Sequence, residues 1–133
     1  MLDKLDAEFA FGRQALDVRA YRQELLSSNI ANSDTPGYKA RDIDFRAAMA
    51  SAGSADATVK LATTNAGHLS IDPNTEASAN LKYRTPLAPS LDGNTVDAQQ
   101  EQAAFADNTV RYQATLTFLS ARFKGLMTAI TGQ

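Results

Sequence analysis

The fold is decided by one stretch near the N-terminus, Asn29-Ile30-Ala31-Asn32-Ser33-Asp34-Thr35-Pro36-Gly37-Tyr38-Lys39. Pro36 and Gly37 stand at the central positions of a type II turn, because proline fixes φ and glycine accepts a positive φ. Proline also disfavours helical geometry at Thr35, so a helix that enters this stretch should end close to Asn32. As a local motif alone, the stretch could equally be an ordinary helix stop.

The residues before this turn predict one long helix, 3–32. Residues recur along it in alternating steps of three and four, which is the seven-residue repeat of a coiled-coil seam. The seam contains Leu2, Leu5, Phe9, Gly12, Leu16, Arg19, Gln23, Leu26 and Ile30. Two of these positions are charged or polar and one is glycine, so the apolar stripe is narrow. A helix with so narrow a stripe is marginally stable alone and should dock on a partner.

The last third of the chain predicts a second long helix, 96–131, with the same repeat. Asp97, followed three residues later by Gln100, resembles a capping box, and Asn94 is another candidate cap. The seam contains Phe105, Thr109, Tyr112, Leu116, Leu119, Phe123, Leu126 and Ile130. Phe118 and Met127 widen the apolar stripe in the C-terminal half. This half is the most apolar part of the chain.

The middle of the chain, 33–95, predicts a turn followed by an irregular insert. Residues 42–46 alternate polar and apolar, as a short half-buried strand does, and 47–50 are good helix formers. Residues 51–58 are low in complexity and typical of a flexible loop. Short apolar-polar-apolar triplets that could pair as strands are Val59–Leu61, Leu69–Ile71 and Leu81–Tyr83.

These patterns together predict a mainly α fold, with residues 1–133 as a single domain. The long N- and C-terminal helices should pack as an antiparallel, coiled-coil-like pair beside an irregular insert with at most a small β component. Each helix would cover the stripe of the other. Apolar surface left over would meet other subunits.

Composition excludes several classes of function. The 133 residues carry a formal charge of −2 and no cysteine, which disfavours nucleic-acid binding and excludes disulfides, cysteine-ligated zinc and thiol catalysis. The N-terminus shows no cleavable signal peptide, and no apolar run approaches the roughly 18 residues of a membrane helix. We therefore expect no direct membrane insertion. The protein would stay in the cytoplasm or leave by a route that does not read a Sec-type signal.

No set of residues predicts catalysis, a cofactor or a metal site. His68 is the only histidine, and with Asp72 nearby it is better explained as a solvated loop residue than as half of a catalytic pair. Asp42 and Asp44 lie among arginines and are better explained as a charged strand surface than as an acid/base pair. Nucleotide-binding and hydrolase motifs are absent from the sequence. An enzyme is not predicted.

The residue string from Asn29 to Tyr38 resembles the N-terminal signature of the rod and hook axial proteins of the bacterial flagellum. Residues 39–45 and 89–97 are similar to the proximal rod members of that family, and 91–97 narrows the resemblance to them. Residues 108–114 and 125–130 fit the same pattern. The resemblance covers both ends of the chain, and only the Ser/Ala-rich middle departs from it.

The resemblance implies a structural subunit that polymerises through its terminal helices into the drive shaft that transmits torque for motility. It implies type III export without a cleaved signal peptide, and a place in the periplasmic rod of the basal body, at its proximal end. Implied partners are further copies of the chain, other rod subunits, a FliE-like adaptor, the membrane ring and the export gate. The subunit-interface residues are expected to be Leu5, Phe9, Leu16, Leu26, Asn29, Ile30, Asn32, Thr35, Pro36, Gly37, Tyr38, Tyr112, Leu116, Leu119, Phe123, Leu126 and Ile130.

Two alternatives stay open at this point. One is a different rod subunit of the same family, against which residues 91–97 argue. The other is a cytoplasmic helical adaptor or export chaperone that binds partner helices through the same apolar stripes.

Overall fold

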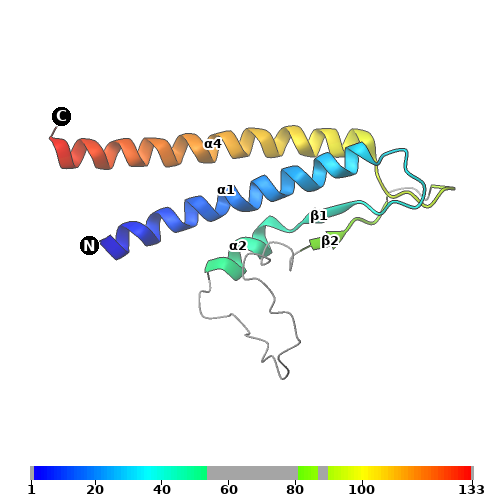
Figure 1. The fold of residues 1–133 in the computed structure, drawn as a ribbon, viewed down its shortest axis with the longest axis horizontal. Coiled ribbons are helices and arrows are strands. Elements are labelled where there is room, and N and C mark those ends of the chain that lie inside the picture. Colours follow the sequence, from blue (N-terminus) through cyan, green and yellow to red (C-terminus); the bar gives the residue numbers. More distant parts are fainter. Residues whose placement is uncertain (1, 54–80, 87–89, 133) are drawn as a thin grey trace, which may run out of the picture.

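The computed structural model describes residues 2–53, 81–86 and 90–132, with the backbone alone at 2–8 and 51–53 (Figure 1). Along the chain it contains α1 (Leu2–Ala31), β1 (Arg41–Ile43), α2 (Phe45–Gly53), β2 (Leu81–Tyr83) and α4 (Ala98–Thr131). The prediction of a mainly α fold with long terminal helices and a small β component is confirmed. The predicted strands Val59–Leu61 and Leu69–Ile71, together with His68 and Asp72, lie outside the described residues.

The two long helices run antiparallel, so both chain termini lie at the same end of the molecule (Figure 1). The side chain of Asp97 accepts hydrogen bonds from the backbone N–H groups of Gln99 and Gln100, at 3.1 and 3.2 Å. This is the cap that the sequence indicated, and α4 begins at the next residue because of it. At the other end Gly132, with φ of +73°, donates its N–H to the Thr128 carbonyl at 2.9 Å.

The two short strands form an antiparallel pair beside the helices. The register sets Arg41 opposite Tyr83 and Ile43 opposite Leu81, so the predicted strand at 81–83 is confirmed. The pairing therefore brings the chain just before α2 beside the chain at 81–83.

Two expectations about the start of the insert were wrong. The predicted strand through residue 46 ends at Ile43, because the Asp44 carboxylate accepts from the Ala47 N–H at 3.1 Å and so caps α2. The low-complexity residues from Ser51 were expected to form a loop, but α2 continues through Gly53. Alanine-rich composition favours helix once a cap is present.

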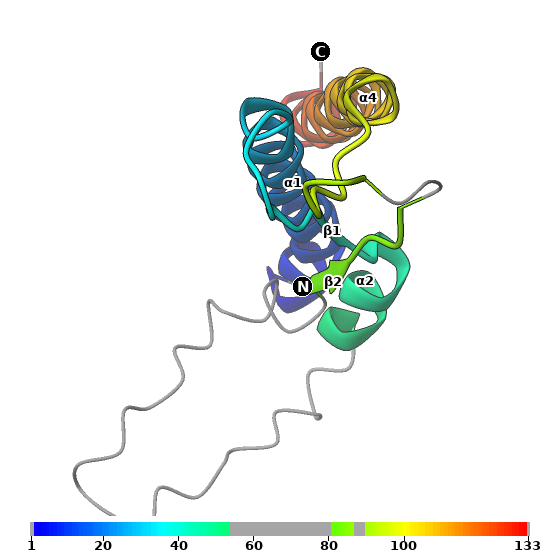
Figure 2. The ribbon, with the colours of Figure 1, turned by 90° about the vertical axis from the view of Figure 1, so that its right-hand side faces the viewer.

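A small core lies on the face of α1 that is turned away from α4. Val18 and Leu25 of α1 are buried there with Ile43 and Ala48, and the partly buried residues around them are Tyr21, Phe45, Met49 and Leu81. Viewed end-on, α1 therefore forms a middle layer between α4 and the layer of α2 and the strands (Figure 2). Val18 and Leu25 are not in the predicted seam of α1, so this second apolar face was not predicted.

Candidate functional site

The turn after α1 has the predicted geometry. The Tyr38 N–H donates to the Thr35 carbonyl at 3.2 Å, and Gly37 has φ of +74°. A Cβ built at Gly37 would find nothing within 4 Å, so the glycine is required by the backbone conformation and not by space. Pro36 and Thr35 are exposed at the tip of the turn.

A second segment, just before α4, is bonded to this turn, and we call residues 32–40 and 91–97 together the corner. Asn94 is buried, and its side-chain amide donates to the carbonyls of Asn32, Ser33 and Thr35 at 3.0, 2.7 and 2.9 Å. The backbone adds two cross-links, Gly37 N–H to Asp92 carbonyl at 2.9 Å and Thr95 N–H to Tyr38 carbonyl at 3.0 Å. Two of the sequence strings that carried the resemblance, 29–38 and 91–97, thus lie against each other. These side-chain and backbone hydrogen bonds fix the turn relative to the segment before α4.

Asn29 joins the corner to the long helices. It is fully buried, and its amide nitrogen donates to the Arg41 carbonyl at 2.7 Å and to the Glu101 carboxylate at 3.0 Å. Its amide oxygen accepts from the Arg41 N–H at 3.1 Å and from the Tyr38 hydroxyl at 3.4 Å. Every hydrogen-bonding group of this side chain has a partner. One residue therefore fixes α1 relative to β1, the turn and α4.

A chain of ion pairs continues from Glu101 across the strands. Arg84 lies 3.1 Å from the Glu101 carboxylate and 2.6 Å from that of Asp42, which also receives two hydrogen bonds from Arg22, each of 2.9 Å. Burial alone would raise the pKa of Asp42, but the hydrogen bonds from Arg22 and Arg84 outweigh it and hold the pKa below its ordinary value. The charges therefore connect all the layers of the fold.

The interface between α1 and α4 changes character along its length. Near the corner it is polar: the Gln23 amide donates to the Thr109 hydroxyl at 2.8 Å, and Asn108 donates to the Arg19 carbonyl at 3.0 Å. Near the termini it is apolar: the rings of Phe9 and Phe123 meet edge to face, with centroids 6.1 Å apart. Of the two polar residues that interrupt the predicted seam of α1, Gln23 is thus matched by a polar residue of α4, whereas the Arg19 guanidinium lies over the Phe45 ring of α2, 4.1 Å from its centroid.

The helices approach each other closely at Gly12. A Cβ built at this glycine would lie 2.8 Å from the Cδ1 atom of Leu119, so the absence of a side chain makes room for the leucine.

The predicted interface residues fall into distinct environments. Leu26 and Asn29 are fully buried, and partly buried positions are Phe9, Leu16, Ile30, Asn32, Tyr38, Tyr112, Leu119 and Leu126. The exposed positions are Thr35, Pro36, Gly37, Leu116, Phe123 and Ile130. Leu5 lies in α1, but its side chain lies outside the described residues. The structure therefore brings some of the set together inside the monomer and leaves the rest on its surface.

The C-terminal half of α4 presents large apolar side chains to solvent. Phe123 is 58% exposed and Ile130 76%, and the further members of this surface are Leu116 and Met127. Single exposed apolar residues are ordinary, but a run of them along one helix is typical of an interaction surface.

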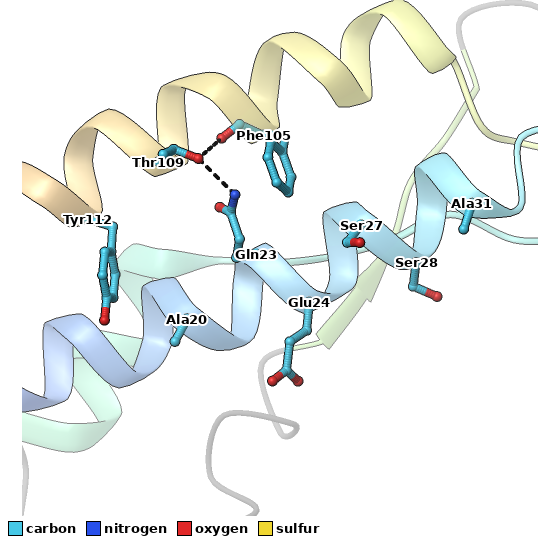
Figure 3. A pocket seen from close by; sticks show the side chains of 9 residues that line it. All are labelled: Ala20, Gln23, Glu24, Ser27, Ser28, Ala31, Phe105, Thr109 and Tyr112. Carbon is cyan, nitrogen blue, oxygen red and sulfur yellow. Dashed lines mark hydrogen bonds between the residues drawn. The ribbon is translucent and has the colours of Figure 1, made fainter.

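An apolar groove continues this surface toward the corner (Figure 3). Its volume is about 720 Å³, and it lies between α1 and α4. Small residues of α1 form its floor, and Phe105 and Tyr112 of α4 stand over them (Figure 3). The full lining is Ala20, Gln23, Glu24, Ser27, Ser28, Ala31, Phe105, Thr109 and Tyr112.

The arrangement of the described residues offers packing surfaces. Within the described ranges, no group of three or more His, Asp or Glu side chains is placed to hold a metal ion. No helix in that part of the chain is long and apolar enough to cross a membrane.

Sequence reasoning missed the buried polar residues of the corner and of the ion-pair chain. Asn94 was identified only as a candidate helix cap, and Glu101 not at all. Glu101 lies one turn after the cap, where an acidic residue is commonly explained by the helix dipole. Its burial against Asn29 and Arg84 depends on contacts between segments far apart in sequence.

Comparison with known proteins gives a consistent result. Residues 9–39, which include most of α1 and the turn, match the family described as flagella basal body rod protein. The chain is 48% identical over 134 residues to the flagellar basal body rod protein FlgB of Escherichia coli K12, covering 98% of this chain and 97% of the relative. For FlgB of Salmonella typhimurium LT2 the identity is 46% over 136 residues, with 99% of both chains covered. For FlgB of Cereibacter sphaeroides it is 52% over 120 residues, covering 90% and 91%.

Proposed function

Since this chain belongs to the flagellar basal body rod protein family, and is therefore a structural subunit of the flagellar rod, we propose that it assembles through its two terminal helices. In this proposal the chain joins further copies of itself and other rod subunits at the proximal end of the drive shaft. The reading as a cytoplasmic adaptor or chaperone is not favoured by these relatives.

One observation supports the proposed mode of assembly. The apolar flank of α4, formed by Leu116, Phe123, Met127 and Ile130, is exposed although α4 is already paired with α1. Phe123 touches Phe9 and is still 58% exposed, so α1 is too narrow to cover it. Burying apolar surface contributes about 25 cal/mol per Å², so a neighbouring subunit that covered this flank would gain binding free energy along its whole length. A protein that stays monomeric would gain no free energy from exposing this apolar flank.

The predicted interface residues divide between two proposed roles. Leu26, Asn29, Asn32 and Tyr38 would act inside the subunit, because they fix the angle at which the chain leaves α1. Leu116, Phe123 and Ile130 would contact neighbours directly. The partly buried Leu119 and Leu126 would do both, since each lies at the edge of the α1–α4 seam.

We extend the proposal to location and partners by similarity to the axial proteins. The subunit would leave the cytoplasm by type III export with no segment removed, and would meet a FliE-like adaptor, the membrane ring and the export gate. It would have no catalytic role. The intact mass of the chain recovered from basal bodies tests the first of these points, because removal of a leader would lower that mass.

The assembly proposal is tested with basal bodies from a flagellated bacterium whose own copy is replaced by this chain. The wild-type chain should co-purify with detergent-extracted basal bodies, and Phe123→Asp should remain in the soluble fraction and abolish swimming, because a charge would enter an apolar contact. The matched control is Thr117→Asp, an exposed position on the same helix whose hydroxyl bonds only to the carbonyl of Gln113. Normal rods with Phe123→Asp would refute a contact at this flank. A wild-type chain found only in soluble extract would refute the rod assignment itself.

A further inference from the structure

The groove beside α1 is suited to an apolar occupant. Three of its polar lining side chains already have partners: Gln23 is bonded to Thr109, and the Ser28 hydroxyl lies 3.1 Å from that of Tyr38. Small-molecule sites of this volume commonly present a few convergent polar groups to orient the ligand. The floor of Ala20, Ser27 and Ala31 instead leaves room for bulky side chains from outside.

A second unpartnered surface lies on another side of α4. Ala114, Phe118, Ala121 and Gly125 recur in steps of four and three and therefore share one flank, which we call the donor flank. Phe118 is 75% exposed, and it lies about 140° round the helix from Phe123, on the side away from the groove. Nothing lies within 4 Å of a Cβ built at Gly125, so no contact among the described residues explains a glycine in the middle of a helix.

We propose that the groove of one copy receives the donor flank of α4 from a second copy, with Phe118 as the inserted side chain. This inference rests on the proposed function and specifies the contact between copies. The small residues around Phe118 let the incoming helix approach closely, and the small floor of the groove accepts the ring. Large side chains thus stand opposite small ones on both surfaces, which is how packed helices interdigitate.

Charge supports a second copy as the occupant. After Asp107, α4 contains Arg111, Arg122 and Lys124 and no acidic residue up to Thr131. The charged side chain in the lining of the groove is the exposed Glu24. A cationic helix therefore enters an acidic-edged groove, and this complementarity favours the pairing over one in which two groove sides meet.

The proposed contact joins two different surfaces of two copies, so each copy keeps one surface of each kind free for a further copy. A heterologous contact of this kind repeats from copy to copy and generates rings or open helical assemblies instead of a two-fold dimer. It also leaves the exposed flank with Leu116, Phe123 and Met127 next to the incoming helix, because the groove continues into that flank.

The absence of cysteine from the chain allows a direct test by cross-linking. The full-length variants Ser27→Cys, in the groove, and Ala121→Cys, on the donor flank, are purified and treated with a short bismaleimide. A mixture of the two single variants should give a cross-linked dimer, neither variant alone should do so, and the double variant should give a ladder of higher species. Phe118→Ser in the double variant should lower the cross-linked yield about tenfold or more.

The matched control pairs Ala121→Cys with Arg46→Cys, an exposed position on α2, and should give no ladder. Circular dichroism establishes that each variant is folded, and Ala20→Cys replaces Ser27→Cys if that variant is not. The same cysteines are then cross-linked in basal bodies. Self-linking of Ser27→Cys, linkage only to a different protein, or no linkage in either setting by folded variants would overturn the inference. The rod assignment would survive each of these results as long as the chain is present in basal bodies.

Discussion

The corner and the C-terminal half of α4 are opposite in character, although both belong to the same pair of helices. At the corner, and at Asn29 beside it, asparagine amides are fully used, and the backbone of the turn is bonded to the segment before α4. At the far end, α4 contacts α1 along one narrow edge and leaves Phe118 and Ile130 in solvent.

The difference shows how the molecule separates shape from association. Directional polar contacts fix an angle, because they weaken steeply when geometry changes. Apolar contacts are non-directional and depend on area, so they suit a surface that must meet a neighbour. A subunit that must place its helices accurately and then associate needs the first kind at one end and the second kind at the other.

The sharpest test introduces aspartate at one buried position near the corner and at one exposed position in the C-terminal half of α4. Leu26→Asp buries a charge at a position with no exposure, and should lower the free energy of unfolding by at least about 4 kcal/mol. Phe118→Asp should change it by less than about 1 kcal/mol, because that side chain is already solvated. Urea unfolding followed by circular dichroism measures both. Equal losses would mean that the far end is also part of the monomer's core.

A smaller loss is expected from removing the donor that holds the corner. Asn94→Leu leaves three carbonyl groups without their amide donor and should lower the free energy of unfolding by about 2–3 kcal/mol. Asp34→Leu, at an exposed position of the same turn, is the control and should change little. If the two variants unfolded at the same urea concentration, the corner would not be held by Asn94.

The backbone of the turn contributes less again. Gly37→Val should cost about 1–2 kcal/mol, because a β-branched residue disfavours positive φ, while the open space around the site excludes a clash. Gly37→Asn should recover part of the loss, since asparagine tolerates this conformation better. Chemical denaturation of the three proteins ranks them. A valine variant as stable as wild type would contradict the positive φ.

The smallest change in the free energy of unfolding near neutral pH is expected from titration of the ion-pair chain. The folded-state pKa of Asp42 is lowered, so its stabilising contribution is present above its ordinary pKa and is lost as pH falls from about 4 through the folded value. Unfolding midpoints should therefore change little from this group between pH 7 and 5 and fall below pH 4. The slope below pH 4 should be shallower in Asp42→Asn. An unchanged slope would place the acid sensitivity elsewhere.

The sequence predicted the features that depend on neighbours along the chain. The turn at Pro36 and Gly37, the cap at Asp97 and the two long helices all follow from local propensity and repeat. The strand at 81–83 was also found, because alternation of polar and apolar residues is a local signal.

The features that the sequence did not predict depend on contacts between segments that are far apart in the chain. The second apolar face of α1, with Val18 and Leu25, is interrupted by Arg22 and Asn29 and so does not look like a core stripe. Arg22 can be half-buried because it is paired with Asp42, and Asn29 can be buried because it is bonded to Glu101. Periodicity cannot identify partners supplied by distant segments.

The pairing of β1 with β2 has a practical consequence for the segment that leaves α2 and returns at Leu81. The strand register holds Ile43, just before α2, beside Leu81, and the corner is bonded independently of this segment. Added length between two points that the rest of the fold holds costs little entropy, about 0.6 kcal/mol for each doubling of a flexible connection. A peptide tag or a small reporter grafted there would leave the spacing of the long helices unchanged, which makes this segment the natural place to label the subunit.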